Sequence, residues 1–547
     1  MHLYLQIAEI LTEIFSSYDG DKESIKRLYS LALVCKIFHE PARDALWRFQ
    51  RSFVTLVKMF PEDLWDEVED PVMARPRAAV NITAASHSET SPLSRSRTVV
   101  TFKRPLLPSD WARFQLYAKL MEHLSFGQSP YDWSVSGRRE LSPSVFRAIQ
   151  NSLDLCHFDR PLLQNLTTFT FKQYFGGISL RDACVFLGLR LKTLDFAISR
   201  PLDGLRTFAK ALKAGCPAIE HLFVSNYQPS DRVNRVVSDL VCSLSSLRAV
   251  RIFVYSFPMS LHNRVSLMVL PFLAMRHLDI TIASTASAVE YLQVTSSSSD
   301  LEYLSITVDR IPPTPAQLRA ALTVMQQSGF CVTLTTFVLG DRVTSAGDFI
   351  PLHALDAQTL SPLLQCRNLQ DINIHISYGH AGIDNSFLKE MASAWPCLRS
   401  LGLYSCYAHP WHAKADLRGL ICLAQNCHSL ESVSLQFDVS LPPTATYPDK
   451  AIRCEWLTQL EVSRSHISDP LAVATFLADV FPNLTLYHEY YTPGTGDFED
   501  ELSEDEQSPE YIEMAKRWKD VVQILNARKQ ELSQSLTNRN VRMQSLI

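Results

Sequence analysis

Five histidine and cysteine residues have side chains and spacings that could support chemistry. His409 and His412 lie three residues apart in HPWHAK, a spacing at which two imidazoles can bind one metal ion. No third and fourth ligand follows at a recognisable spacing, so the stretch is interpreted as a loop. Cys422, Cys427 and His428 lie in ICLAQNCHSL, where packing between a helix and a strand accounts for them. The sequence therefore predicts no metal site.

Other signatures of catalysis are also missing from the sequence. It contains no Walker loop, no dinucleotide-binding glycine fingerprint and no GxSxG nucleophile motif. Cys35 lies in an apolar stretch, where a thiol is expected to be buried rather than held as a reactive thiolate. We therefore expect a protein that is not an enzyme and needs no cofactor.

The twelve cysteines are predicted to act as small buried hydrophobic residues. They include no CxxC pair. Four of them lie shortly before predicted strands: Cys216, Cys366, Cys397 and Cys427. This placement favours packing over disulfide bonds, as is usual in a reducing compartment.

The elements that position these residues are set by one pattern, apolar-x-x-apolar-x-apolar. It occurs as LTTFTF, LKTLDF, IEHLFV, LRAVRI, MRHLDI, LEYLSI, LTTFVL, LQDINI, LRSLGL, LESVSL and LTQLEV. The first residues are Leu166, Leu191, Ile219, Leu247, Met275, Leu301, Leu334, Leu369, Leu398, Leu430 and Leu457, with a degenerate twelfth at Leu484. Successive copies are 25 to 35 residues apart, and apolar residues at helical spacing between them, as in 205–212 and 233–241, predict intervening helices.

A half-buried strand followed by an amphipathic helix resembles the long-repeat class of leucine-rich repeats. Each unit leaves apolar surface uncovered until a neighbour stacks on it. The predicted fold class is α/β: a short all-helical head, then a curved solenoid with parallel strands on its concave side and helices on its convex side. The irregular spacing between 301 and 369 predicts longer loops there.

Side chains at the third, fifth and seventh positions of the strand pattern are predicted to face the concave side. The candidate substrate-binding residues on that face are Phe223, Arg251, Phe253, His277, Asp279, Tyr303, His375 and Tyr404. Exposed aromatic residues and arginine are enriched where proteins bind one another, so this face is the expected binding surface. Its charges have mixed signs and indicate no strongly charged ligand.

Six segments are predicted along the chain. They are a helical module at 1–70, a flexible linker or loop at 71–100, a helical N-terminal cap at 101–160, about twelve leucine-rich repeats at 161–490, an acidic disordered loop at 491–510 and a C-terminal capping helix at 511–547. Asp110 is the expected N-cap of a helix that carries Trp111, Phe114, Leu120 and Leu124. The last helix should start at Ser508-Pro509 and cover the final repeat with Trp518, Val521, Val522 and Leu525.

Composition and charge indicate which kinds of molecule the chain is not expected to bind. The chain has 547 residues, 46% of them hydrophobic and 20% charged, as in a folded water-soluble protein. Its net charge of −5 comes from the run at 497–510, which has eight carboxylates and no base, so neither nucleic acid nor a membrane surface is an expected partner. Glu9 and Glu13 fall where a secretory signal would be apolar, which predicts a cytoplasmic or nuclear protein.

Residues 28–49, LYSLALVCKIFHEPARDALWRF, are predicted to form one helix that is apolar around most of its circumference. One stripe consists of Leu31, Val34, Cys35 and Phe38, and a second of Leu33 and Ile37. A head of about seventy residues cannot easily bury both stripes. Another surface is therefore expected to cover one of them.

Together with IAEILTEIF at 7–15, this stretch resembles an F-box, the helical module that binds the Skp-type adaptor of cullin-RING ubiquitin ligases. Through LVKMFPEDLWDEV and TFKRPLLPSDWARF the chain is also similar to the fungal, mushroom-type F-box proteins with leucine-rich tails. The resemblance implies adaptor contacts at Ile7, Glu9, Ile10, Leu11, Ile14, Phe15, Leu33, Val34, Cys35, Phe38 and Trp47. Ala8 stands where the family has a proline that shapes the start of the first helix.

The resemblance implies a substrate-recognition subunit of an SCF-type E3 ubiquitin ligase, in which the repeats hold a protein substrate near a ligase elsewhere in the complex. The alternatives are a leucine-rich-repeat scaffold that acts outside a ubiquitin ligase, and a head that simply packs on the repeats. Ser503 precedes Glu504, Asp505 and Glu506, a pattern that acidophilic casein kinases favour, although a solvated spacer also explains the run.

Overall fold

The structure is a computed structural model that forms two compact units, Met1–Phe253 and Val254–Ile547. The residues it describes are 8–18, 22–70, 97–126, 139–155, 161–172, 179–198, 204–226, 231–244, 246–254, 274–282, 285, 288–289, 292–293, 300–309, 313–342, 354–376, 379–405, 413–441, 453–462, 465–487 and 509–544. Ser503 and most of the predicted acidic loop, like most of the predicted linker at 71–100, lie outside these residues.

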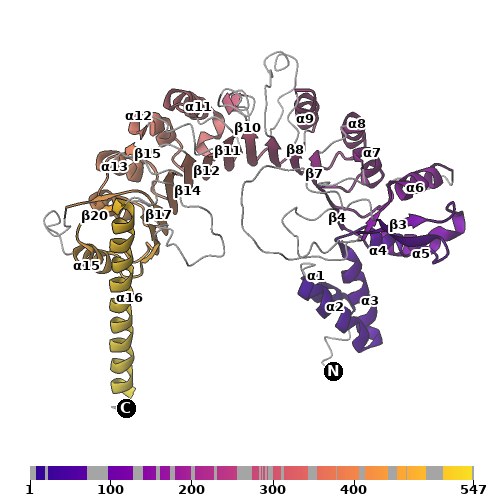
Figure 1. Cartoon of the computed structure of the whole chain (residues 1–547), viewed down its shortest axis with the longest axis horizontal. Coiled ribbons are helices and arrows are strands. Elements are labelled where there is room, and N and C mark those ends of the chain that lie inside the picture. Colours follow the sequence, from indigo (N-terminus) through magenta and orange to yellow (C-terminus); the bar gives the residue numbers. More distant parts are fainter. Residues whose placement is uncertain are drawn as a thin grey trace. The chain divides into compact units, whose positions relative to one another are not determined.

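Each unit is built on parallel strands that lie next to one another in chain order (Figure 1). The first unit contributes β1 (Phe49–Gln50), β4 (His123–Phe126), β6 (Thr168–Phe171), β7 (Thr193–Ile198), β8 (His221–Asn226) and β9 (Ala249–Val254). The second contributes β10 (His277–Ile282), β11 (Tyr303–Asp309), β12 (Thr336–Arg342), β14 (Asp371–Ile376), β16 (Ser400–Ser405), β17 (Ser432–Ser434), β19 (Gln459–Glu461) and β21 (Thr485–Tyr487). These fourteen strands, counted among the described residues, confirm the predicted α/β repeat fold.

All twelve predicted strand motifs coincide with a strand of this sheet. The first apolar residue of each motif is buried, and in the eleven regular motifs the strand starts two residues later. Hydrogen bonds between main-chain groups of neighbouring strands hold successive repeats together. The carbonyl of Glu302 accepts hydrogen bonds from the N–H groups of Thr335 and Thr336 in the next repeat, at 2.9 and 3.0 Å. The same pair of bonds recurs between other neighbouring strands of each unit.

The strand ladder begins earlier than the predicted start at 161. Strand β4 pairs with β6, and β1 pairs with β4, both in parallel. Leu124 therefore lies in a strand, and the prediction that it belongs to a helix with Trp111 is wrong. MEHLSF at 121–126 fits the same apolar-x-x-apolar-x-apolar pattern, and its Met121 and Leu124 are buried. This copy was hidden by a gap of 45 residues to the next one, which the repeat spacing did not anticipate.

The head consists of α1 (Ala8–Ser16), α2 (Lys22–Val34) and α3 (Lys36–Arg48). The single helix predicted over 28–49 is wrong, because Cys35 has extended backbone angles, φ −159° and ψ 164°, and separates α2 from α3. The new helix is held by the N–H groups of Phe38 and His39, which both donate to the Cys35 carbonyl at 3.2 Å. His39 Nδ1 lies 3.2 Å from the carbonyl oxygen of Ala32 in α2. The break therefore turns the two apolar stripes in different directions.

A second, smaller sheet and an aromatic core lie beside the first strands. Its order is β2 (Trp65–Asp70), β3 (Arg97–Phe102) and β5 (Arg139–Leu141), with β2 antiparallel to β3. Residues 97–100 of the predicted linker thus belong to a strand. The helical elements here are α4 (Val54–Val57), η3 (Pro108–Asp110), α5 (Trp111–Ala118) and α6 (Pro143–Leu155). The rings of Phe60 and Phe114 stack at 4.6 Å, and Trp111 Nε1 donates to Ser152 Oγ at 3.0 Å.

Asp110 occupies the N-cap position of α5, as predicted, but its side chain makes no capping hydrogen bond to that helix. Its backbone has helical angles, and its carboxylate instead accepts the N–H of Leu107 at 2.8 Å. The same carboxylate receives two hydrogen bonds from Arg104, at 2.7 and 3.1 Å. Helix α5 ends at Ala118, which leaves Leu120 in the following turn. The short polar side chain was correctly placed at a helix start, but it stabilises the preceding 3₁₀ turn.

Helices or 3₁₀ turns connect the strands and lie on one side of them in each unit (Figure 1). The first unit has α7 (Leu180–Ala183), η4 (Cys184–Phe186), α8 (Leu205–Gly215) and α9 (Asp231–Ser243). The second has α11 (Pro315–Gln327), η6 (Gly329–Val332), α12 (Ala357–Leu360), η7 (Ser361–Gln365), α13 (Asn385–Ala394), α14 (Leu417–Asn426) and α15 (Pro470–Val480). Small strand pairs join β13 (Ala354–Asp356) to β15 (Gly379–Gly382) and β18 (Asp438–Val439) to β20 (His466–Ile467).

Helix α16 (Pro509–Gln544) packs on α15 and β20 at the end of the second unit. Its start at Pro509 matches the prediction. Trp518, Val521 and Leu525 are buried, and Val522 is half-buried. The indole Nε1 of Trp518 donates to the carbonyl of Ser465 at 2.8 Å, and Arg517 Nη1 donates to the carbonyl of Ile467 at 2.9 Å. The helix thus covers apolar surface that the last repeats would otherwise expose.

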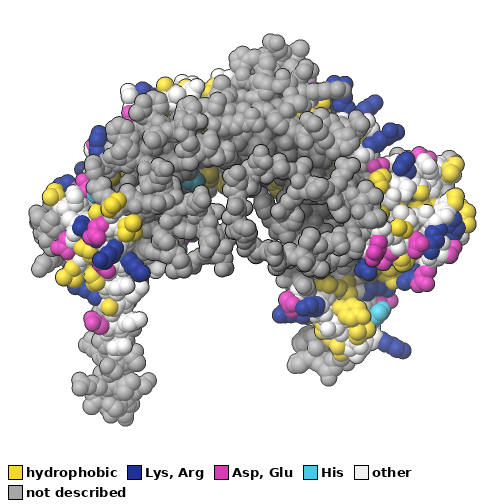
Figure 2. Space-filling model, viewed as in Figure 1, with side chains coloured by type: hydrophobic (Ala, Val, Ile, Leu, Met, Phe, Trp, Pro, Cys, Tyr) yellow, Lys and Arg dark blue, Asp and Glu magenta, His cyan; other side chains and the backbone are white. Residues whose placement is uncertain are grey.

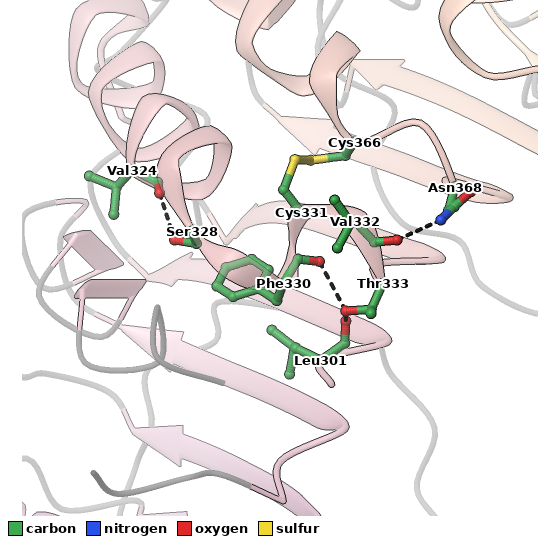
Figure 3. The surroundings of a disulfide bond; sticks show 9 residues. All are labelled: Leu301, Val324, Ser328, Phe330, Cys331, Val332, Thr333, Cys366 and Asn368. Atoms are coloured by element: carbon green, nitrogen blue, oxygen red, sulfur yellow. Dashed lines mark hydrogen bonds between the residues drawn. A yellow bond between two sulfur atoms is a disulfide. The ribbon is translucent and has the colours of Figure 1, made fainter. Parts of the chain in front are cut away.

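Cys331 and Cys366 form a disulfide, with their Cα atoms 4.8 Å apart (Figure 3). The expectation that the cysteines next to strands serve only for packing is therefore wrong for Cys366. Among the described residues, the free cysteines are Cys35, Cys184, Cys216, Cys397, Cys422, Cys427 and Cys454. None of the helices in the described part of the chain has the length and apolarity that a membrane span requires.

Candidate functional site

The first candidate surface lies where α2 meets α3. Leu33 is 70% exposed, Val34 63% and Ile37 44%, although all three are large apolar side chains. They fall within five consecutive residues, and we refer to them as the junction patch. Figure 2 shows hydrophobic side chains gathered on the visible side of the head. Charged, exposed side chains of Lys36 and Glu40 lie close by in the sequence.

The junction patch is not needed to hold the head together. Leu11, Phe15, Leu28 and Ala42 form a buried core of the head's own, with Leu31, Phe38, Ala45 and Leu46 packed against it. The rings of Phe15 and Phe38 meet edge to face at 5.8 Å. Apolar side chains that stay exposed while a core forms without them are typical of a binding surface. The head thus packs Leu31 and Phe38 of the first stripe on its core, and leaves Val34 of that stripe exposed together with the second stripe, Leu33 and Ile37.

The predicted adaptor-binding residues therefore fall into different environments. Leu11, Phe15 and Phe38 serve the head core, whereas Leu33 and Val34 are exposed. Four more lie at the surface or half-buried: Glu9, Ile10, Ile14 and Cys35. Ile7 lies outside the described residues. Ile37 and Tyr29, at 62% exposure, are exposed apolar residues that were not among the predicted contacts. For Ile37 the signal was present, because it shares the second stripe with Leu33.

Trp47 joins the head to the repeats rather than lying free. Its ring lies 4.4 Å from that of Tyr117 in α5, at an angle of 34°. The next residue, Arg48, forms an ion pair with Glu122 at 2.8 Å. Phe49 then starts β1 and stacks on His123 of β4, at 4.2 Å and 8°. Because α3 runs directly into the first strand, head and first repeats are continuous.

The second candidate surface is the side of the strands that carries alternate, less buried side chains. In the first unit Phe223 is half-buried, and the guanidinium carbon of Arg251 lies 5.5 Å from the centre of its ring. Asp195 is the register partner of Phe223 on β7, and its carboxylate pairs with Lys172 at 2.8 Å. The buried neighbours of Phe223 are Leu222 and Val224, as the strand pattern predicts. Phe253 lies on β9, but its side chain is outside the described set.

In the second unit the same face carries His277, Asp279, Tyr303 and His375. The rings of His277 and Tyr303, neighbours on β10 and β11, stack at 5.7 Å and 28°. Asp279 follows on β10 and is half-buried. His375 is exposed and pairs in register with Tyr404 of β16, whose side chain is outside the described set. The described part of this face thus offers aromatic and imidazole rings beside the carboxylate of Asp279.

The described residues bring together no group of three or more His, Cys, Asp or Glu that could hold a metal ion. His409 and His412 lie outside those residues. His428 meets the ring of Trp456 edge to face at 5.3 Å, and Cys422 is half-buried in α14. Burial raises the pKa of the Cys427 thiol to about 11, because a thiolate there would lose its solvation. Cys422 and Cys427 are thus placed for packing, as the sequence indicated, whereas His428 is exposed beside Trp456.

Comparisons with known proteins add little to this picture. No protein-family model and no curated protein matches the sequence. Solved structures do match, among them a chain of the crystal structure of the Rad7 and Elc1 complex in yeast. It is 16% identical, the match covers 67% of this chain and 75% of that chain, and the TM-score is 0.36.

Proposed function

We propose that this chain is the substrate-recognition subunit of an SCF-type cullin-RING E3 ubiquitin ligase. In this proposal the helical head binds a Skp-type adaptor, and the exposed strand face holds a protein substrate. The chain itself has a positional role: it raises the effective concentration of a substrate lysine near the ubiquitin-loaded enzyme of the complex. No catalytic residue is then required of it.

The observation that carries the proposal is the junction patch. Its three apolar side chains are exposed next to a head core that is complete without them. A partner that covers Leu33 and Val34 would gain about 1 to 2 kcal/mol from each side chain that it fully buries. Exposed charges beside the patch would supply the polar rim that protein interfaces usually have.

Two further features are compatible with adaptor binding. Ala8 is the first residue of α1, a position at which the proline of F-box sequences would also be tolerated. The alanine therefore does not prevent the helix from starting there. The continuity of α3 with β1, together with the Trp47 and Arg48 contacts, would hold the first repeats in a fixed relation to a bound adaptor.

The test is an adaptor titration of the full-length double variant Leu33→Asp, Val34→Asp. Both side chains are exposed, so the head should stay folded, whereas the introduced charges would be desolvated in the interface. We expect adaptor affinity to fall at least about 100-fold, measured by titration calorimetry. Phe38 is unsuitable for this purpose, because it packs on the head core.

Leu189→Asp is the matched control, since Leu189 is 68% exposed in the same unit but distant in sequence from the head. It should bind adaptor like the unmodified protein. Adaptor binding by the head variant at the unmodified level would contradict the proposal. Recovery from native cells of partners of the repeats, with neither adaptor nor cullin, would favour a scaffold outside a ligase.

A further inference from the structure

Cys331 and Cys366 occupy equivalent positions in two consecutive repeats. Each lies three residues before the first apolar residue of its strand motif, Leu334 and Leu369. Their separation of 35 residues equals the spacing of the two motifs. In a stacked repeat array, equivalent positions of neighbouring units lie side by side. The disulfide is therefore a covalent link from one repeat to the next.

Hydrogen bonds that also join neighbouring repeats surround the disulfide (Figure 3). Thr333 Oγ1 donates to the carbonyl of Leu301 in the preceding repeat at 3.0 Å. Asn368 Nδ2 donates to the carbonyl of Val332, one repeat back. From Leu166 onward these repeats also have the longest motif spacings, 33 residues after Leu301 and 35 after Leu334. The disulfide thus links two repeats of the second unit where the motif spacing of that unit is longest.

The two sulfur atoms are shielded but lie close to the surface. Cys331 is 5% exposed and Cys366 is fully buried. Val332, the residue that follows Cys331, is 67% exposed. A small thiol would reach the bond after a local opening of η6, and Cys331 would be the cysteine it meets first. Exchange at the bond would then require only this local opening and not unfolding of the whole unit.

A second pair of cysteines shows that the equivalent position is not sufficient for a bond. Cys427 and Cys454 also lie three residues before the motif residues Leu430 and Leu457 of neighbouring repeats. Both are buried and free. The Cys427 sulfur lies 3.3 Å from the carbonyl oxygen of Trp395 in the preceding repeat, and thus faces away from the repeat of Cys454. This pair is a natural control.

We propose that Cys331 and Cys366 form a redox-responsive lock between two consecutive repeats. To close it, one cysteine thiolate attacks glutathione disulfide, forming a mixed disulfide and releasing glutathione thiolate. The thiolate of the other cysteine then displaces the second glutathione. Two protein thiols and one glutathione disulfide thus become one protein disulfide and two glutathione molecules, and a small thiol in excess reverses both steps.

The experiment uses the full-length protein, reduced with dithiothreitol and then treated with glutathione disulfide. Peptide mapping without reduction should recover a linked Cys331–Cys366 peptide, while Cys427 and Cys454 remain free thiols. Hydrogen exchange over 329–342 and 360–376 should slow by at least about tenfold on oxidation, because the link suppresses separation of the two repeats. Exchange over 417–435 should be unchanged.

The variant Cys331→Ser, Cys366→Ser should show the fast exchange of the reduced protein under both conditions, and Cys427→Ser should respond like the unmodified protein. Persistence of both thiols in glutathione disulfide would overturn the proposal. So would a linked peptide that dithiothreitol cannot open in the folded protein, since that bond would be a permanent brace.

Closure of the lock would also affect the strand face, since β12 and β14 join the repeats that it links. Substrate affinity would then depend on redox state. This consequence rests on the proposed function, whereas the lock is tested without any partner. Loss of adaptor binding in the head variants and failure of the lock are therefore distinguishable results.

Discussion

At the scale of single residues, the junction between head and repeats contains a half-buried histidine, His123. His123 stacks on Phe49, and its neighbour Glu122 pairs with Arg48. Burial lowers the pKa of His123 below its ordinary value of 6.5; the Glu122 carboxylate opposes this shift and the Arg48 guanidinium adds to it. The neutral imidazole of His123 is therefore the form that the folded protein favours beside Phe49.

This predicts a loss of stability in weak acid. The folded state binds fewer protons at His123 than the unfolded chain does, so stability rises with pH through the window just below 6.5 and falls as pH drops through it. The contribution is at most about 1.4 kcal/mol per pH unit. His123→Phe keeps a ring beside Phe49 and should show a smaller difference in melting temperature between about pH 7.5 and 5.5. An unchanged difference would exclude His123 as its source.

At the scale of elements, each strand separates side chains that build the core from side chains that can bind. The cation–π contact of Arg251 with Phe223 illustrates the exposed set, and it links β8 to β9. Aromatic and arginine anchors often contribute more than about 2 kcal/mol each to an interface. Their half-exposed position on a strand contributes much less to folding.

The double variant Phe223→Ala, Arg251→Ala should therefore lose substrate capture while keeping adaptor binding. Its free energy of unfolding should change by less than about 1.5 kcal/mol, because neither side chain belongs to the core. Proximity labelling in cells would measure capture, and denaturant titration would measure stability. Tyr487→Ala is the control, an exposed aromatic residue at the equivalent strand position of the last repeat. Retention of every labelled partner would place the binding surface elsewhere.

At the scale of the whole molecule, each repeat is stabilised by its contacts with the repeats on either side. In such an array the end units have only one neighbour, so they depend on capping elements. In the second unit the capping element is helix α16, which buries Trp518, Val521 and Leu525. Without it the surface around Ser465 and Ile467, both of which bond to the helix, would be open to water.

Deletion of 509–547 should therefore loosen the end of the second unit and leave its middle intact. We expect hydrogen exchange over 459–487 to rise at least about tenfold, and exchange over 336–376 to change by less than about twofold. Deletion of 530–547 alone, which keeps Trp518, Val521 and Leu525, is the matched control and should resemble the full chain. A uniform rise across the second unit would mean that it opens as one body.

The sequence by itself determined the repeat fold and the positions of the strands from Leu166 onward. The reason is that both are encoded locally: a buried leucine, then alternation of buried and exposed side chains, as Leu222, Phe223 and Val224 show. It also predicted the face of α16 that carries Trp518, because a helical stripe depends only on spacing along one element. These features need no knowledge of which distant segments meet.

Only the tertiary structure decided which apolar residues of the head are core and which are exposed. A helical wheel cannot tell whether Phe38 or Leu33 faces the neighbouring helix, and the break at Cys35 reorients the two stripes. The pairing of Cys331 with Cys366 and the ion pair of Arg48 with Glu122 likewise required distances between segments. Each of these outcomes depends on how close separate elements approach in space, which spacing along one chain does not specify.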